Sequence, residues 1–261
     1  MKVSSSHWPF TALAAVPGQH IALRLADRVR GLAIDERSRC DIDRLCAIGG
    51  FRYRSAMLDA KIGGHEALLI PKIDGGFEIL VDGRGDFADR RTWRRRLRFR
   101  IAHEIAHSFF YDRTCRPARR LLPPSEAEEV FCDIFASALL VPPADIERLP
   151  PAPKSLIGLA DQFDVSIQVA ARAFIRCNQG ISIWGLRGLP ETGGGANLSI
   201  LWSAGPLRLS SGTHLASRLS TLPAVSCDDE QEIDFDNGMQ TYRVKLARLS
   251  KTYFVGTPCS L

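Results

Sequence analysis

The sequence has little that would suit an exported or membrane-embedded protein. No apolar run in its 261 residues approaches the roughly 20 residues of a membrane-spanning helix. The first 20 residues hold one lysine and a short apolar patch, which makes a poor signal peptide. The seven cysteines are odd in number and form no C-x-x-C pair, so they favour isolated thiols over a disulfide framework. We therefore expect a cytoplasmic protein without a membrane partner.

The composition is that of an ordinary globular chain. Hydrophobic residues make up 45% of the sequence and charged residues 24%. The length allows one large domain or two moderate ones, each with enough buried surface for a core. Composition and length do not indicate a function, so the evidence for one has to come from local motifs.

The most informative motif is His103-Glu104-Ile105-Ala106-His107, an H-E-x-x-H pattern. Residues four apart turn through about 400° of helix, so both imidazoles leave the same helix face. That geometry suits two corners of a tetrahedral zinc site. Glu104 follows its neighbour by about 100° of helix and can flank a metal without binding it. The pattern therefore predicts a zinc hydrolase in which Glu104 is the general base.

The residues around this motif favour a buried helix from Trp93 to Tyr111. Leu97, Ile101, Ile105 and Phe109 recur every four residues, and no glycine or proline interrupts them. A polar His-Glu-His group on a buried helix needs partners, which a metal ion would supply. The alternative is a helix that carries two unrelated surface histidines.

A second predicted helix offers the third metal ligand. Ser125 and Glu128 form a capping box at its start, and Glu129 and Asp133 lie four residues apart on one face. We predict Glu129 as the ligand, and Asp133 as the acceptor of an imidazole N–H that fixes a histidine tautomer. Glu126 and Glu128 are the competing carboxylates, but their position in the first turn is explained by the helix dipole and by solvent.

HEIAH followed by EVFCDIFASALLVP resembles the ImmA/IrrE metallopeptidases, whose second motif is E-x-x-A-[ND]-x-F-A-x-x-L-L-x-P. The chain departs from that pattern at Cys132, where the family usually has alanine. The matching positions are Glu129, Asp133, Phe135, Ala136, Leu139, Leu140 and Pro142. The resemblance implies a zinc endopeptidase that cleaves a helix-turn-helix repressor, often encoded nearby, and so relieves repression of stress, DNA-damage or anti-phage genes.

Fold and domain boundaries follow from the resemblance and from local patterning. We predict an α+β fold with a gluzincin-like minimal metallopeptidase domain over 1–150. A helix-turn-helix-like module over 151–180 and a β-rich, GAF-like regulatory domain over 181–261 would follow it. The module could read DNA or serve as a packing or docking helical hairpin, and its mostly alanine second helix favours the hairpin.

Element predictions outside the motifs rest on periodicity and turn residues. We expect helices over 21–32, 42–48 and 214–219, and an acidic loop over 227–236. Strands are expected over 51–54, 67–71, 77–81, 181–186, 198–202, 242–246 and 252–255.

Arginines crowd the approach to the first metal-binding helix and the segment after it. One interpretation is a solvated helix entry. The other is a surface for nucleic acid or for an acidic part of the substrate, with single-stranded DNA as an activator and Trp93 and Tyr111 as stacking platforms. The residues of this surface would be Arg94, Arg95, Arg96, Arg116, Arg119 and Arg120.

Cys115 lies in the segment that links the two ligand-bearing helices. Because that segment is tied to the metal site at both ends, it could reach back to it. A thiolate there would occupy the fourth zinc position and close an open catalytic site. We therefore consider Cys115 as an inhibitory fourth ligand, against the alternative of an inert loop cysteine.

The oxyanion-stabilising group is not assigned by sequence. His65, Tyr53, Tyr111 and Arg113 are polar enough, but none has a spacing argument. A different class of function also stays open, namely a catalytically silent DNA-sensing or DNA-binding regulator on a peptidase fold. Loss of Glu104 or of a ligand would favour that class, and no such loss is seen.

Overall fold

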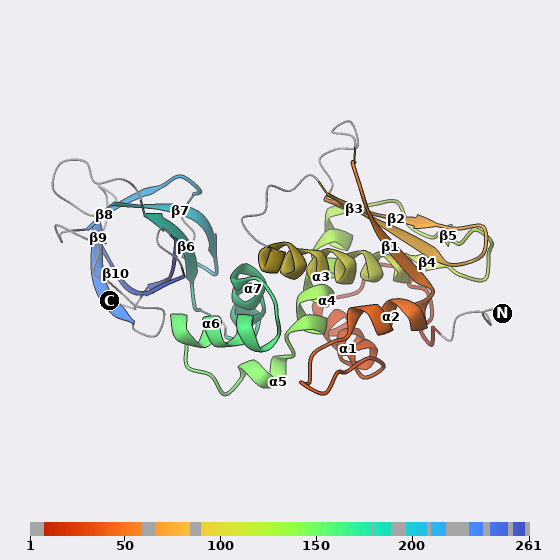
Figure 1. The fold of residues 1–261 in the computed structure, drawn as a ribbon, viewed down its shortest axis with the longest axis horizontal. Helices are drawn as coiled ribbons and strands as arrows, with labels where there is room; N and C mark the ends of the chain where they lie inside the picture. Colours follow the sequence, from red (N-terminus) through yellow and green to blue (C-terminus); the bar gives the residue numbers. More distant parts are fainter. Residues whose placement is uncertain are drawn as a thin grey trace. The chain divides into compact units, whose positions relative to one another are not determined.

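A computed structural model shows two compact units. The first holds residues 1–142 and 162–166, and the second holds residues 143–161 and 167–261 (Figure 1). The residues described are 8–58, 66–83, 90–178, 180–188, 197–207, 210–217, 230–236, 241–249 and 253–258. Within these ranges no helix is long and apolar enough to cross a membrane. The predicted domain boundaries at residues 150 and 180 stay predictions.

The first unit begins with two helices and a small sheet. The helices are α1 (Gln19–Arg30) and α2 (Ile42–Gly49), and the strands are β1 (Phe51–Ala56), β2 (Ala67–Pro71) and β3 (Phe77–Asp82). The strand order is β1-β3-β2, with β1 parallel and β2 antiparallel to β3. All five elements were expected from the sequence. The fold is therefore α+β, as predicted.

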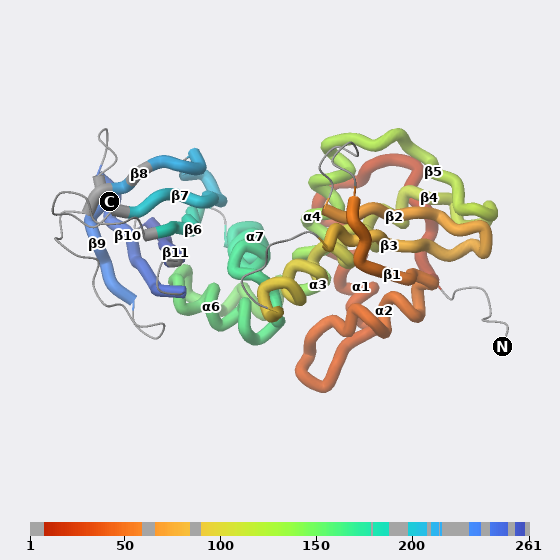
Figure 2. The backbone as a smooth tube through the Cα atoms, turned by 45° about the horizontal axis from the view of Figure 1, so that its top comes forward, coloured from red at the N-terminus to blue at the C-terminus, as the bar shows by residue number. Residues whose placement is uncertain are grey.

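The helix with the H-E-x-x-H motif is α3 (Arg90–His107), which packs against β2 and β3 on one side and against α4 (Glu126–Leu140) on another (Figure 2). The prediction that this helix continues to Tyr111 is wrong. After His107 the chain tightens into a short 3-10 turn, where the Ser108 hydroxyl donates to the Ile105 carbonyl at 2.6 Å. The tightened turn sends Phe109 and Phe110 into the core, where each ring lies against an aromatic ring of α4.

A two-stranded hairpin links the two helices. Strand β4 (Tyr111–Asp112) pairs with β5 (Arg119–Arg120), so that Tyr111 lies opposite Arg120. Helix α4 then begins as the capping pattern predicts, with the Ser125 side chain accepting a hydrogen bond from the Glu128 backbone N–H at 3.2 Å. The motif helices therefore meet through a short, ordered connection.

The second unit has three helices followed by a closed antiparallel barrel. The helices are α5 (Pro143–Ile146), α6 (Pro153–Gln162) and α7 (Ile167–Cys177), and α6 and α7 are the helix pair predicted for residues 151–180. The barrel order is β10-β11-β6-β7-β8-β9. Its strands are β6 (Ile183–Gly188), β7 (Asn197–Ala204), β8 (His214–Ser217), β9 (Gln231–Asp236), β10 (Thr241–Arg248) and β11 (Tyr253–Pro258).

Two predictions in this unit are wrong. Residues 214–217 form strand β8 instead of the start of a helix, and residues 231–236 form strand β9 instead of an acidic loop. In β9 the buried Ile233 and Phe235 alternate with acidic residues that pair with Arg243 and Lys245 of the neighbouring strand. The acidic residues therefore suit the outer face of a sheet. Residues 218–219 and 227–229 of these predicted segments lie outside the described residues. The GAF-like role of the domain stays a prediction.

The barrel core gives a stability prediction. Trp184 is fully buried, lies 5.3 Å from the ring of Tyr242, and donates its indole N–H to the Leu207 carbonyl. We expect Trp184→Ala to destabilise this unit by about 3–5 kcal/mol, because it leaves a large cavity. The control Leu201→Ala, at a side chain on β7 that is 38% exposed, should change stability by less than about 0.5 kcal/mol. Hydrogen exchange of the β10 amides would measure both effects, and equal protection in the two variants would contradict the packing assignment.

Candidate metal centre

Three side chains that could bind a metal converge between the end of α3 and the start of α4. The Nε2 atoms of His103 and His107 are 3.2 Å apart. Glu129 places one carboxylate oxygen 3.2 Å from the first nitrogen and the other 3.5 Å from the second. Bonds of about 2.0–2.1 Å in a tetrahedral zinc site put neighbouring ligand atoms about 3.3 Å apart. The donor set and its spacing therefore fit one zinc ion.

Each imidazole is held from behind by a carboxylate. His103 donates from Nδ1 to Asp133 at 3.1 Å, and His107 donates from Nδ1 to Glu128 at 2.6 Å. Donation from Nδ1 leaves the lone pair on Nε2, which is the nitrogen that faces the other donors. The sequence analysis predicted this role for Asp133 and missed it for Glu128.

Glu128 is the main correction to the predicted site. It was expected to be a solvated residue of the first helical turn, but its side chain is fully buried. Only its backbone N–H takes part in the cap, and its carboxylate turns instead to His107 and Arg120. The capping pattern already explains a glutamate at position 128. The sequence therefore carried no separate signal that this carboxylate would bond to His107. Glu126, by contrast, is exposed.

Glu104 lies where the helical repeat predicts. It follows His103 on α3, is 6% exposed, and its charge favours the protonated form of the His103 imidazole. Burial opposes that charged form, but the hydrogen bonds to Asp133 and Glu129 outweigh it and raise the pKa of His103 to about 9. Because a metal binds the unprotonated ring, metal uptake near neutral pH should release this proton.

The sulfur of Cys132 is a competitor for the third ligand position. Among the residues that the structure describes, His103, His107 and Cys132 form a group whose ligand atoms all lie within 4.8 Å of one another. Burial raises the pKa of the Cys132 thiol and so disfavours the thiolate that would bind zinc. Glu129 places one oxygen 3.2 Å from the His103 Nε2 and the other 3.5 Å from the His107 Nε2. These short distances and the buried thiol favour the predicted Glu129 as the third donor.

The Cys115 thiol is bonded to a residue outside this group. It lies in the loop closed by β4 and β5, and its thiol donates to an Asp112 carboxylate oxygen at 3.5 Å. Arg113, in the same loop, is held among the rings of Trp8, Phe51 and Phe77 at 5.1–5.5 Å. The loop is therefore anchored on the sheet, and the role of Cys115 as an inhibitory fourth ligand stays a prediction.

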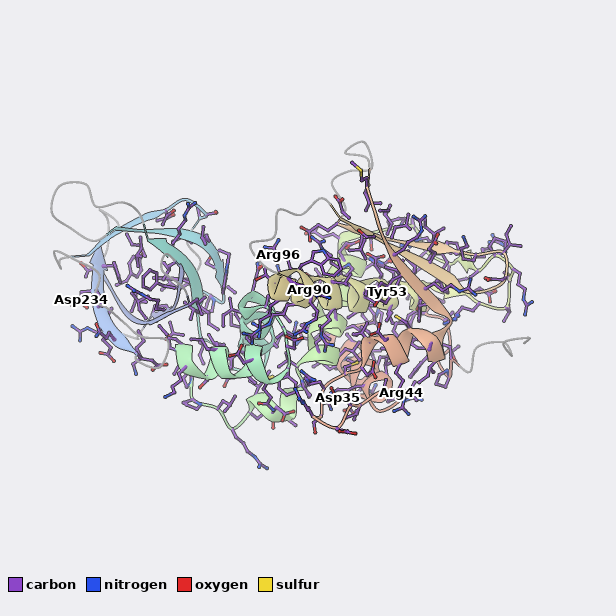
Figure 3. All side chains as sticks on the ribbon, viewed as in Figure 1. Asp35, Arg44, Tyr53, Arg90, Arg96 and Asp234 are labelled. Carbon is purple, nitrogen blue, oxygen red and sulfur yellow. The ribbon has the colours of Figure 1, made fainter. Side chains whose placement is uncertain are left out.

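Several arginines of the predicted basic surface hold neighbouring elements together. Arg94 and Arg95 both pair with Asp164, at 2.9 and 3.2 Å, and Arg120 pairs with the buried Glu128. Arg96 on α3 is exposed (Figure 3). Arg94, Arg116 and Arg119 are exposed as well, and the predicted surface stays a prediction. Tyr111 is 8% exposed, so it is not an open stacking platform.

The candidates for oxyanion stabilisation are engaged elsewhere. The Tyr53 hydroxyl donates to Asp43 at 2.7 Å, and the Tyr111 hydroxyl accepts from Arg120 at 3.4 Å. Arg113 donates to the Gly49 carbonyl. His65 lies outside the described residues. The structure therefore assigns no oxyanion-stabilising group.

Of the comparisons with known proteins, the family model agrees with the motifs. A Mycobacterium tuberculosis transcriptional regulator is 14% identical, with 93% of this chain and 76% of that chain covered and a TM-score of 0.42. A search of curated proteins gives no significant match. Residues 89–174 match the family model described as Peptidase_M78, IrrE N-terminal-like domain. That segment contains both motif helices and is similar to the IrrE N-terminal-like domain, in agreement with the resemblance to ImmA/IrrE metallopeptidases.

Proposed function

We propose that the protein is a zinc-dependent endopeptidase that cleaves a helix-turn-helix repressor. The observation that carries the proposal is the convergence of two imidazole Nε2 atoms and a carboxylate at 3.2–3.5 Å, with Glu104 next to them on α3. Two helices that only pack against each other do not require two imidazoles and a carboxylate to face one another, whereas a metal site does. The family match supports a peptidase, and the repressor substrate comes from the resemblance.

The residues of the site have separate roles in this proposal. Bound zinc would lower the pKa of a water molecule to about 7 and polarise the scissile carbonyl. Glu104 accepts the proton of the attacking water and returns it to the leaving amine. Asp133 and Glu128 hold the two imidazole rings in the tautomer that presents Nε2. Glu129 is half exposed, so the substrate can approach on its side of the donor group.

The proposed substrate and its cellular setting come from the resemblance to ImmA/IrrE metallopeptidases. A repressor encoded next to this protein is the first candidate, and cleavage would relieve repression of stress, DNA-damage or anti-phage genes. Such a substrate acts in the cytoplasm, where a chain of isolated thiols is also expected. The five cysteines that the structure describes are all free, which fits that setting.

A cleavage assay tests the proposal. The full chain is loaded with zinc and incubated with the purified neighbouring repressor, and mass spectrometry identifies the products. We expect cleavage at a defined bond, its loss with a chelator, and its return when zinc is added back. Cleavage that persists after complete metal removal would contradict the mechanism. Zinc-loaded protein that leaves the repressor intact would contradict the proposed substrate.

Activation by single-stranded DNA is a separate prediction. Arg96, Arg116 and Arg119 are exposed, so their guanidinium groups can reach phosphates. We expect the triple change of these residues to glutamine to weaken oligonucleotide binding. Each lost phosphate contact should reduce the slope of log K against log salt by about 0.7. Fluorescence anisotropy across a salt series measures the oligonucleotide affinity and its dependence on salt. Wild-type protein that shows no binding at low salt would rule out this surface.

A further inference from the structure

We propose that Glu128 and Arg120 act as a positioning pair for His107, holding its imidazole in the orientation and tautomer that bind the metal. The inference rests on the proposed metallopeptidase function and adds two residues to it. Neither residue would touch the metal or the substrate. Their effect would pass through the His107 ring.

The first observation is the setting of the His107 ring. Its Nδ1 is 2.6 Å from a Glu128 oxygen, and its Nε2 is 3.2 Å from the Nε2 of His103. The ring therefore spans the distance between a carboxylate and the donor group. A proton held on Nδ1 by that carboxylate leaves the Nε2 lone pair free to bind the metal.

The second observation is that Glu128 has a matched counter-ion. A fully buried carboxylate is costly unless a charge and hydrogen bonds compensate it. Arg120 donates from Nη2 to both carboxylate oxygens, at 2.7 and 2.5 Å. Its Nε donates to the Leu122 carbonyl at 2.7 Å, and its guanidinium lies 5.4 Å from the centre of the Tyr111 ring. Arg120 is thus itself fixed, so it can fix the carboxylate.

The third observation is how the chain delivers Arg120. The β4–β5 hairpin begins four residues after His107, and its register places Arg120 opposite Tyr111. The guanidinium thereby reaches the first turn of α4, where Glu128 lies. The segment between the ligand helices therefore supplies the counter-ion of a carboxylate that holds a ligand histidine.

The carboxylates that accept hydrogen bonds from the two histidine Nδ1 atoms differ in their exposure to solvent. The Asp133 side chain behind His103 is 43% exposed, whereas the Glu128 side chain behind His107 is 1% exposed. Hydrogen bonds in a dry environment are stronger, and their loss is more costly, than those in contact with water. We therefore expect metal binding to depend more on Glu128 than on Asp133.

The alternative is that the pair only braces α4 against α3 and has no effect on the metal. Thermal stability would not separate the two roles, because breaking a buried ion pair lowers stability in either case. Metal affinity and the visible spectrum of bound Co²⁺ do separate them. Both report on the ligand histidines directly.

The experiment titrates the full chain with Co²⁺ and measures Zn²⁺ affinity by competition with a chromophoric chelator. We expect Glu128→Gln to lower zinc affinity by about 10- to 100-fold and to change the Co²⁺ spectrum. Arg120→Gln should act in the same direction, and Arg120→Lys, which keeps the charge, should recover part of the loss. The double variant should be no worse than the more impaired single one, because Arg120 acts through Glu128.

Matched controls are available in the same segments. Glu126→Gln changes an exposed carboxylate in the same helical turn, and Arg119→Gln changes the exposed neighbour of Arg120. Both should keep metal affinity within about 2-fold, a change of only about 0.4 kcal/mol in binding free energy. If Glu128→Gln does not fold, Glu128→Asp replaces it, since that change keeps the charge and withdraws the carboxylate by one carbon. It should also weaken zinc binding.

The outcomes distinguish this inference from the proposed function. Wild-type metal affinity and spectrum in the folded Glu128 variants would overturn the positioning role and leave a structural brace. A wild-type chain whose zinc affinity depends on Glu128 and Arg120 but that cleaves no repressor would contradict the proposed function alone. A wild-type chain that binds no metal would overturn both.

Discussion

Glu104→Gln should retain zinc and lose repressor cleavage by about 10²- to 10⁴-fold or more. The amide keeps the shape of the side chain but cannot accept a proton from the attacking water. The residue is 6% exposed and lies beside His103, so the substitution changes the charge of a confined position without opening a cavity. Zinc content and the rate of product formation are measured on the same preparation.

The control for this variant is Glu126→Gln, which removes a carboxylate that is exposed to solvent. It should cleave at the wild-type rate. Full activity in Glu104→Gln would remove the general base from the mechanism. Loss of zinc in that variant would instead show that Glu104 helps to hold the metal.

Glu129→Ala should lose stoichiometric zinc and with it all cleavage. Its two carboxylate oxygens lie 3.2 and 3.5 Å from the Nε2 atoms of His103 and His107, as a third ligand requires. Removing it leaves two protein ligands, too few for a stable catalytic site. Metal analysis after dialysis against a weak chelator decides the result.

Cys132→Ala is the matched test, because the thiol is the competing donor and the related peptidases usually have alanine there. It should keep a full equivalent of zinc. The opposite pattern, with zinc lost from Cys132→Ala and kept by Glu129→Ala, would reassign the third ligand to sulfur. Glu126→Ala should keep zinc. The sequence analysis explained Glu126 and Glu128 alike by the helix dipole and by solvent. In the structure Glu126 is exposed, whereas Glu128 is buried beside His107 and Arg120.

The two motif helices were predictable because their causes are local, whereas the end of α3 and the β4–β5 hairpin were not predicted. Spacing of four residues places His103 and His107 on one face of a helix, and Ser125 with Glu128 marks the start of the next. The strands of the first sheet were equally readable from short apolar runs between glycine-rich turns. In the second unit, β9 was predicted as a loop because its acidic residues outnumber the buried Ile233 and Phe235 that alternate with them. Asp234 and Glu232 pair with basic residues of β10.

The sequence by itself determined that His103 and His107 share one helix face and that Glu129 and Asp133 share another, because helical periodicity decides which side chains lie together. It did not determine what each face meets. Whether Arg120 would be a surface charge or the partner of Glu128 depended on the register of the β4–β5 hairpin and on how α3 packs against α4. The same packing buried Glu128 and tied the Cys115 loop to the sheet. These contacts form only when segments separated in the chain come together, so only the tertiary structure decided them.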